Sequence, residues 1–473
     1  MRIQMRIQRT RRQILKEVAR VGGGLALAGV LAACAQQTSA TAGAATAQTL
    51  SKAPLKLTVW GGTNITGLQA QAALWNKQHP TMPVTAAPQP SGVTGSTELQ
   101  KFLTAEAAGT AADVVYIDRF QLASLAFRGA LSPIDQYVAV DKYDLKRFYP
   151  EILKEAYGVD KKLYGLPNST DDRIMFWNKD AFASAGLDPT KGPVTYADLK
   201  AYAIRLTKSK NGKLTQLGWN YNLPGVGVLY QFGWEYGGHF LADNGRKSTM
   251  NSPQVVEGVQ AILNIVDAMG GAQEIAAFTA SFQTKTNDPF ITGQQVMVYG
   301  FELGTIAQYK PHMNFGYGMF PVPKAGQKPM TFSGGFAWTT PAKSKHPDAS
   351  WQLMRALVSK ESVITGQEAQ KSFNAKAGQG YLVQWSGQPA LDKELIAKFK
   401  TGIPAVDTAE QYALNAMQYT RVRPISPAAQ EAWDQLTLAW QEIFYHKETA
   451  QQALTTANQA VQKVLDQAYA SHR

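Results

Sequence analysis

The stretch of sequence that decides the fold is Tyr164-Gly-Leu-Pro-Asn-Ser-Thr-Asp-Asp-Arg-Ile-Met-Phe-Trp-Asn-Lys-Asp180. A polar bridge in its middle joins two apolar pieces whose length and composition are typical of strands. We interpret this bridge as a crossing from one folded lobe to another. The chain has 473 residues, 45% of them hydrophobic. This apolar content is sufficient for a large hydrophobic core, but the chain is long for a domain with a single core. We therefore expect two lobes.

Strand and helix patterns alternate on both sides of this crossing. Residues 55–60 predict a strand that ends at two glycines, and residues 65–79 have a helical pattern. Residues 113–117 predict a short buried strand with helical pattern before and after it. A stretch rich in Gly, Pro and Phe occupies residues 315–341, and helices follow, including residues 451–467. This order predicts α/β construction, in which ligands bind beyond the carboxyl ends of parallel strands.

The N-terminal residues have the pattern of an export signal. Residues 2–20 are rich in arginine, residues 21–33 are apolar and small, and the run closes on Leu31-Ala-Ala-Cys34. The apolar run is shorter than the roughly 20 residues that a membrane-spanning helix needs, so we predict a signal peptide over residues 1–33. Leu-Ala-Ala-Cys resembles a bacterial lipobox, which implies a lipid on Cys34. Arg11-Arg12 resembles a twin-arginine signal, although a basic leader also contains such pairs by chance.

The composition excludes several classes of function. Residues 1–33 hold seven basic residues and one acid, which leaves 40 basic and 34 acidic residues, a net charge of +6, for the rest. No dense basic tract interleaved with aromatics occurs in that remainder, so we do not expect nucleic-acid binding. Residues 34–51 are almost wholly Ala, Thr, Gln, Ser and Gly, a composition that predicts a flexible tether. The lone cysteine excludes a disulfide within the chain and a thiolate metal site.

Short motifs follow one another in an order that is typical of a known family. They are Asp113-Val-Val-Tyr-Ile-Asp-Arg-Phe120, Gly129-Ala-Leu-Ser-Pro-Ile-Asp135, Lys162-Leu-Tyr-Gly-Leu-Pro167, Trp177-Asn-Lys-Asp180, Ala185-Gly-Leu-Asp188, Val194-Thr-Tyr-Ala-Asp-Leu199, Gly237-Gly238, Thr292-Gly-Gln-Gln-Val-Met-Val-Tyr-Gly300, Ser333-Gly-Gly-Phe-Ala-Trp338 and Ser344-Lys-His-Pro-Asp-Ala-Ser-Trp351. From about residue 55 to 470, the sequence thereby resembles the family 1 extracellular solute-binding proteins, the group that includes maltose-binding protein.

The resemblance implies a fold and a function. The fold is the two-lobed, type II periplasmic-binding-protein-like α/β fold, with the ligand cleft between lobes joined by a multi-strand hinge. We place lobe 1 in residues 52–170 plus 313–341 and lobe 2 in residues 171–312 plus 342–473. The implied function is that of a receptor for an ABC importer, which binds a sugar or oligosaccharide by hinge closure and delivers it to membrane permease subunits. We expect an exported monomer, anchored through Cys34, with no cofactor, no metal and no enzymatic activity.

A sugar presents apolar C–H faces and hydroxyl groups, so its site needs aromatic platforms and a few fixed polar groups. Aromatic, charged and glycine residues at predicted strand ends and crossings, and at the positions where the family places ligand contacts, are the candidates. They are Trp60, Asn64, Asp118, Arg119, Asp171, Asp172, Tyr230, Trp234, Glu235, Phe301, Glu302, Gly335, Trp338 and Arg423. Each has a structural alternative: core packing for the aromatics, a local ion pair for Asp118 and Arg119, and a solvated turn for Asp171 and Asp172.

A second function class stays open at this stage. A secreted glycan-processing hydrolase needs two carboxylates about 5 to 10 Å apart, which Asp118, Asp171, Glu235 or Glu302 could supply. Other enzyme signatures are missing from the sequence. The six histidines show no His-Glu-x-x-His spacing, and no Gly-x-Ser-x-Gly or phosphate-binding Gly-Lys-Ser/Thr motif occurs.

Overall fold

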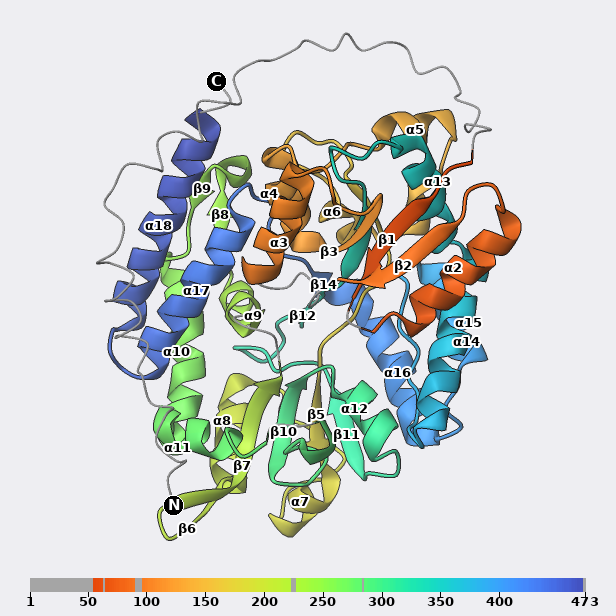
Figure 1. The fold of residues 1–473 in the computed structure, drawn as a ribbon. Helices are drawn as coiled ribbons and strands as arrows, with labels where there is room; N and C mark the ends of the chain where they lie inside the picture. The colour runs from red at the N-terminus through yellow and green to blue at the C-terminus, as the bar shows by residue number, and fades with distance from the viewer. Residues whose placement is uncertain (1–53, 63, 90–95, 223–226, 283–284, 471–473) are drawn as a thin grey trace, which may run out of the picture. The chain divides into compact units, whose positions relative to one another are not determined.

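The computed structural model describes residues 54–62, 64–89, 96–222, 227–282 and 285–470 (Figure 1). The signal peptide predicted over residues 1–33, the lipid attachment at Cys34 and the tether lie outside the described residues. Within the described part, the chain forms two five-stranded sheets and two short strand pairs. In that part, no single helix is both long and apolar enough to cross a membrane. Two successive helices that meet at a bend of 74°, α10 (Pro253–Ala268) and α11 (Gly271–Thr279), pass that test when taken together.

The first sheet has the strand order β2-β1-β3-β13-β4. Its strands are β1 (Leu57–Gly61), β2 (Val84–Pro88), β3 (Val114–Asp118), β4 (Gly165–Pro167) and β13 (Phe336–Thr339). β1 runs parallel to β2 and β3, whereas β13 runs antiparallel to β3 and β4. The helices of this part are α2 (Thr66–Gln78), α3 (Ser96–Ala107), α4 (Leu122–Phe127), α5 (Asp135–Val140), α6 (Pro150–Lys154) and α13 (Pro347–Leu357). Their core contains Trp75, Phe102, Val115 and Trp351.

The second sheet has the strand order β11-β5-β10-β7-β6. Its strands are β5 (Ile174–Asn178), β6 (Lys208–Lys210), β7 (Lys213–Asn222), β10 (Gln295–Gly300) and β11 (Phe315–Gly318). Ile174 and Phe176 enter one core and Met175 and Trp177 another, because successive side chains of a strand point to opposite faces. Both faces of this sheet are covered, which explains the unbroken apolar run in β5.

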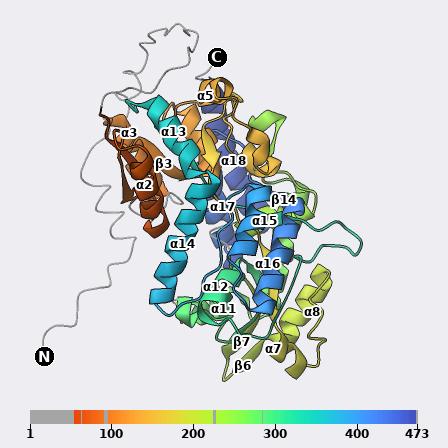
Figure 2. The same cartoon turned by 90° about the vertical axis from the view of Figure 1, so that its right-hand side faces the viewer.

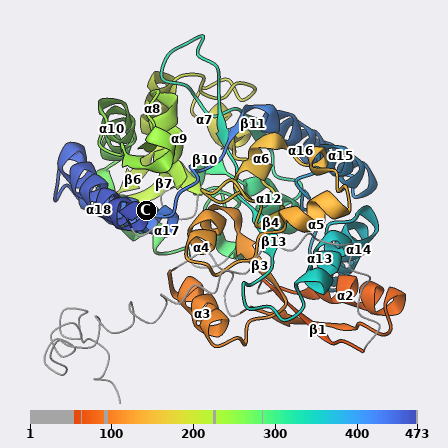
Figure 3. The ribbon, with the colours of Figure 1, turned by 90° about the horizontal axis from the view of Figure 1, so that it is seen from above.

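Two sets of helices cover the second sheet. One core includes residues of seven of the described helices. They are α7 (Lys179–Ser184), α8 (Tyr196–Leu206), α9 (Gly227–Glu235), α10 (Pro253–Ala268), α11 (Gly271–Thr279), α17 (Ala429–Phe444) and α18 (Ala450–Ala470). The other core includes residues of α12 (Glu302–Tyr309), α14 (Lys360–Lys376), α15 (Pro389–Lys398) and α16 (Pro404–Ala416). The view from above separates α17 and α18 from α15 and α16 (Figure 3).

Two of the predicted lobe boundaries differ from the structure. Residues 313–341 were assigned to lobe 1, but β11 pairs antiparallel with β5 in the second sheet. Gly316 lies opposite Trp177 there, and a Cβ on Gly316 would lie 2.1 Å from the indole, so only glycine fits beneath this side chain. Residues 342–473 were assigned to lobe 2, but α13 packs Trp351, Leu353 and Met354 into the first core. The composition of these segments does not indicate that β11 pairs with β5 or that α13 packs into the first core.

Three chain segments run between the sheets. The first joins β4 to β5 through residues 168–173, and the second joins β11 to β13 through β12 (Thr331–Phe332). The third contains β14 (Thr420–Arg421), which pairs in parallel with β12. Both β12 and β14 lie between the two sheets in Figure 1. A further pair, β8 (Leu241–Ala242) with β9 (Lys247–Ser248), extends from the helices around the second sheet. The crossing at residues 168–173 thus joins two separate sheets.

Helix α14 lies along α2 (Figure 2). The two helices approach closely at Gly67 and Gly366, because glycine has no Cβ. A Cβ on Gly67 would lie 3.0 Å from the carbonyl oxygen of Gly366. Gln71 of α2 fixes this arrangement by donating from its amide nitrogen to the carbonyl oxygens of Leu357 and Ser362, each at 3.2 Å. The carboxyl-terminal end of α14 reaches residues 379–380, which are hydrogen-bonded to α12 through Gln308. α14 therefore links α2 of the first part to α12 of the second.

Candidate functional site

The larger cavity lies against the carboxyl end of β1. Its volume is about 430 Å³, which is within the range of roughly 300 to 1,000 Å³ common for small-molecule sites. It is lined by Gly61, Gly62, Asn64, Gly67, Leu68, Gln71, Tyr116, Asn168, Trp338, Val363, Gly366, Gln367, Gln370, Tyr381, Leu382 and Gln384. α2, the first sheet, α14 and residues 381–384 each provide a wall. We call this the amide cavity.

The lining of the amide cavity is polar but uncharged. Six of the described lining residues carry side-chain amides, three are aromatic, and none of them is ionisable as an acid, Lys, Arg or His. The ring of Tyr116 stacks on Phe336 with centroids 4.3 Å apart and planes 9° from parallel, and it contacts Trp338 at 5.0 Å. Burial raises the pKa of the Tyr116 hydroxyl to about 12, so it is a neutral hydrogen-bonding group.

A second cavity of about 180 Å³ adjoins the first. It is lined by Ser169, Thr170, Asp171, Asp172, Ile174, Phe176, Gly300, Phe301, Leu303, Gly304, Gly335, Phe336, Leu382, Val383, Gln384, Trp385 and Ala413. Leu382 and Gln384 line both cavities. The crossing segment at residues 169–172 borders the second cavity, and the first turn of α12 faces it from the second sheet. We call this the apolar cavity, because most of its lining is hydrophobic.

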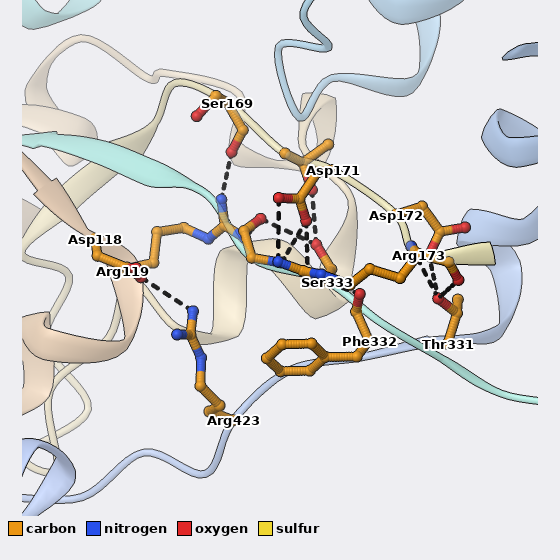
Figure 4. A network of polar contacts seen from close by, with 12 residues as sticks. Asp118, Arg119, Ser169, Asp171, Asp172, Arg173, Thr331, Phe332, Ser333 and Arg423 are labelled. Carbon is orange, nitrogen blue, oxygen red and sulfur yellow. Dashed lines mark hydrogen bonds and ion pairs between the residues drawn. The ribbon is translucent and has the colours of Figure 1, made fainter. Parts of the chain in front are cut away.

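A network of buried charges lies next to the crossing segments, and Figure 4 shows the part of it formed by Asp118, Arg119 and Arg423. Glu155 is 2% exposed and accepts hydrogen bonds from Arg119 Nε and Arg423 Nε, each at 3.2 Å. Arg423 Nη2 also donates to Asp118 Oδ1 at 3.0 Å. Two carboxylates thus face two guanidinium groups, which is the arrangement that lets charges remain in a low-dielectric interior. Burial raises the pKa of Asp118, and Arg423 opposes that shift.

The same network holds the crossing segments in register. Arg119 Nη1 donates to the carbonyl oxygen of Ser169, and Nη2 donates to that of Gly334 at 2.7 Å. Gly335 has φ of +131°, and a Cβ there would lie 2.3 Å from Arg119 Nη1, so both the backbone conformation and the guanidinium require glycine. Arg119 therefore joins the first crossing segment to the second.

A second guanidinium repeats this arrangement on the other side of the crossing. Arg173 Nη1 donates to the carbonyl oxygen of Phe332 at 2.8 Å and lies 2.8 Å from Asp171 Oδ1. The same Asp171 oxygen accepts from the backbone nitrogen of Gly334 at 2.7 Å. The Asp171 carboxylate at the cavity edge is therefore already bound within the protein.

Asp172 differs from its neighbour. Its Oδ1 accepts from the backbone nitrogen of Arg173 at 3.0 Å and from the hydroxyl of Thr331, whereas its Oδ2 is buried without a hydrogen-bond partner. Burial raises the pKa of Asp172 to about 8, and these two hydrogen bonds only partly oppose that shift. At neutral pH this carboxyl is therefore mostly protonated, and it adds little negative charge to the apolar cavity.

The structure divides the sequence candidates into four groups. Asn64 and Trp338 line the amide cavity, and Asp171, Asp172, Phe301 and Gly335 line the apolar cavity. Asp118, Arg119 and Arg423 belong to the buried charge network, in which Arg119 pairs with Glu155 and Asp118 with Arg423 rather than in the local Asp118–Arg119 pair considered as an alternative. Trp60, Tyr230, Trp234, Glu235 and Glu302 line neither cavity.

Packing within the cores determines where the residues of the fourth group lie. All described residues of α9, including Tyr230, Trp234 and Glu235, are buried, because the helix lies within the second part's core. Glu302 is 1% exposed, and Trp60 packs against the first core. Tyr230, Trp234, Glu235 and Glu302 are thus buried and Trp60 is partly buried, and the expectation that these residues contact a ligand stays a prediction.

The family can now be identified from the whole chain. Residues 70–378 match the family of bacterial extracellular solute-binding proteins, which is well over half of the chain. The chain belongs to this family. A binding protein of Brucella abortus (strain 2308) is 26% identical to this solute-binding protein over 356 residues, which cover 74% of the chain and 78% of the relative. The family consists of binding proteins. The matched residues include every strand of the two five-stranded sheets except β1, and part of the lining of each cavity.

Solved structures share the fold of this solute-binding protein. CpMnBP1, solved with mannobiose bound, is 27% identical and superposes with a TM-score of 0.71 over 86% of this chain and 100% of its own. An ABC substrate-binding protein from Listeria monocytogenes, solved in complex with cycloalternan, is 18% identical and superposes with a TM-score of 0.70 over 87% and 99%. The two-lobed type II fold expected from the sequence is thereby confirmed.

Sequence reasoning missed several residues of this site. Tyr116 stands in the middle of an apolar strand, where an aromatic residue usually indicates core. The amides of Asn168, Gln370 and Gln384 have the composition of ordinary surface residues. Glu155 follows a lysine on a short helix, a pattern typical of a solvated face. One local pattern could have indicated a missed site residue, namely a polar residue directly after the carboxyl end of a predicted strand. Among the missed residues, Asn168 shows this pattern.

The charge network predicts a large stability cost for losing Glu155. Glu155→Gln leaves two buried guanidinium groups opposite a single carboxylate, so we expect the free energy of unfolding to fall by about 3–5 kcal/mol. Urea denaturation at neutral pH measures this change. Glu151→Gln is the matched control. Glu151 lies on α6, the helix directly before Glu155 in the chain, but is 40% exposed at its surface pair with Lys154, so its loss should cost less than about 0.5 kcal/mol. Equal costs for the two variants would contradict the network's role.

The raised pKa of Asp172 predicts a pH-dependent effect. Asp172 keeps its proton in the folded chain up to about pH 8 but loses it near pH 4 in the unfolded chain. The unfolded state therefore binds fewer protons over this window, so this group makes stability fall as pH rises. Asp172→Asn removes the titration. Its stability relative to the parent should increase between about pH 5 and pH 8 by at least about 1.4 kcal/mol, the equivalent of one pKa unit, in urea denaturation. A difference that is independent of pH would exclude this interpretation.

Proposed function

We propose that this solute-binding protein is the receptor of an ABC importer and binds a neutral saccharide, held in the amide cavity by hinge closure of the two lobes. Membrane permease subunits would receive the ligand from it. The saccharide is supported by the mannobiose bound to CpMnBP1 and by the chemistry of the cavity lining. The single observation that carries the proposal is that the described lining of the amide cavity combines six amides and three aromatic rings with no charged side chain.

This lining favours hydroxyl groups over anions. Phosphate and carboxylate ligands are usually held by Arg or Lys, through charge-assisted hydrogen bonds. The nearby guanidinium groups of Arg119, Arg173 and Arg423 are instead paired with Glu155, Asp171 and Asp118. Side-chain amides both donate and accept, which suits hydroxyl groups that do the same. A neutral, hydroxyl-rich ligand therefore fits better than a phosphorylated or acidic one.

The stacked pair formed by Tyr116 and Phe336 offers a platform for a sugar ring. Aromatic faces bind the apolar C–H face of a sugar while its hydroxyls reach the surrounding amides. Tyr116 Oη is 3.3 Å from Ser169 Oγ, which fixes the ring against the first crossing segment. The platform lies between the two cavities, since Tyr116 lines one and Phe336 the other.

The geometry gives no support to the hydrolase alternative. Of the four candidate acids, Asp118 is committed to Arg423, and Asp171 to Arg173 and Gly334. Glu235 and Glu302 are 2% and 1% exposed and line neither cavity, and burial raises the pKa of Glu235 to about 8. A proton donor and a water-activating base on opposite sides of one bond are therefore not assembled in either cavity. We accordingly propose binding without turnover.

Isothermal titration calorimetry with a panel of neutral mono- and disaccharides tests the proposal. We expect saturable binding of at least one sugar that is recovered chemically unchanged, and no binding of the corresponding sugar phosphate. Tyr116→Leu should weaken that binding at least about tenfold, because it removes the stacking face. Tyr445→Leu is the control, since Tyr445 is 43% exposed on the surface beside α17. Turnover of the sugar, or preference for its phosphate, would sink the proposal.

We further propose that, after export, a lipid on Cys34 holds the mature protein at the membrane. The lipobox-like sequence Leu31-Ala-Ala-Cys34 supports this proposal. Cys34→Ser removes the sulfur that would take the lipid. We expect the parent to incorporate labelled fatty acid and to fractionate with membranes, and the variant to do neither. Labelling of the variant equal to that of the parent would place the anchor elsewhere.

A further inference from the structure

The apolar cavity differs in chemistry from the amide cavity that it adjoins. Nine of its described lining residues are hydrophobic: Ile174, Phe176, Phe301, Leu303, Phe336, Leu382, Val383, Trp385 and Ala413. Most of these side chains come from the core on the α12 side of the second sheet, so a rigid layer of packed residues supports the cavity. Phe301 and Phe336 are the exceptions. Phe301 is 41% exposed at the start of α12, and Phe336 belongs to β13 of the first sheet.

The polar groups of the apolar cavity are largely engaged within the protein. Thr170 Oγ1 is 2.9 Å from Ser333 Oγ, and the carbonyl oxygen of Ser169 accepts from Arg119. Asp171 is bound by Arg173 and by the backbone of Gly334. Among the described lining residues, the unpaired Oδ2 of Asp172 and the side-chain amide of Gln384 are outside these contacts. They are too few to replace the water around a second sugar ring, so that some of its hydroxyls would be buried without partners.

The size of the apolar cavity suits a single ring. Its volume of about 180 Å³ is close to that of an engineered apolar cavity of about 150 Å³ that binds benzene in another protein. Leu382 and Gln384 line both cavities, so a group placed here is continuous with a sugar in the amide cavity. Four aromatic side chains surround it from different elements and provide edges and faces for an aromatic or aliphatic ring: Phe176, Phe301, Phe336 and Trp385.

We infer that the ligand is a glycoside with an apolar aglycone, whose sugar lies in the amide cavity and whose ring lies in the apolar cavity. This inference rests on the proposed function, since it assigns the second half of a ligand whose first half is the saccharide. The low charge of the apolar cavity agrees with it. Asp171 is neutralised by Arg173, and burial keeps Asp172 mostly protonated at neutral pH.

Matched pairs of glycosides test the inference. Methyl and phenyl glycosides of each sugar in the panel are titrated into the full chain by calorimetry, together with the corresponding disaccharides. We expect the phenyl glycoside of the recognised sugar to bind at least about tenfold more tightly than its methyl glycoside, and more tightly than the disaccharide. Burial of one phenyl ring readily provides a factor of this size.

Variants at exposed phenylalanines locate the effect. Phe301→Ala should reduce the phenyl-to-methyl affinity ratio at least about threefold, because Phe301 lines the apolar cavity. Phe373→Ala is the matched control, since Phe373 is 51% exposed on α14 and lines neither cavity, and it should leave the ratio unchanged.

The outcomes separate this inference from the proposed function. Equal binding of methyl and phenyl glycosides, or tighter binding of the disaccharide, would overturn the apolar aglycone while leaving the saccharide receptor intact. An unchanged ratio in Phe301→Ala would place the aglycone outside the apolar cavity and overturn the inference in the same way. If no sugar or glycoside of the panel bound at all, the proposed function and the inference would fall together.

Discussion

The pairing of two buried guanidinium groups with two buried carboxylates is the interaction on which the rest of the site depends. Arg119 and Arg423 share Glu155, and Arg423 also binds Asp118. Isolated charges in such an interior would be very costly, so the four groups are stable there only as a set. Because Arg119 also holds the carbonyl oxygens of Ser169 and Gly334, the charge network fixes where two crossing segments meet.

The cavities follow from this fixed crossing. Residues 168–172 border both of them, and Gly335 and Phe336 complete the boundary from the second crossing segment. α14 closes the amide cavity on a third side, which its glycine contact with α2 makes possible. The platform of Tyr116 and Phe336 then separates a region rich in amides from a hydrophobic one. The position of each binding surface is thus set by backbone contacts at the crossing rather than by the lining side chains themselves.

Local patterns in the sequence predicted many elements correctly. The strand expected near residues 55–60 is β1, the helix expected over residues 65–79 is α2, and the strand at residues 113–117 is β3. The last helix, expected over residues 451–467, is α18. These elements are visible in sequence because their hydrophobic period, their turn glycines and their polar breaks are all local. The crossing at residues 168–173 was visible for the same reason. The lobe to which an element belongs depends on contacts between residues that are distant in the sequence. The predicted lobes therefore misplace β11, which pairs in the second sheet, and α13, which packs into the first core.

By itself the sequence determined the order of strands and helices, the crossing between lobes and the family. It also placed Asn64, Asp171, Asp172, Phe301, Gly335 and Trp338 among the candidates that line the two cavities. Only the tertiary structure decided that Asp118, Arg119 and Arg423 balance one another around Glu155, and that Tyr230, Trp234 and Glu235 are core. The physical reason is that a charged or aromatic side chain has the same local pattern in a core as in a site. Which of the two it joins depends on partners that are distant in the chain, from 36 residues apart for Arg119 and Glu155 to 305 for Asp118 and Arg423.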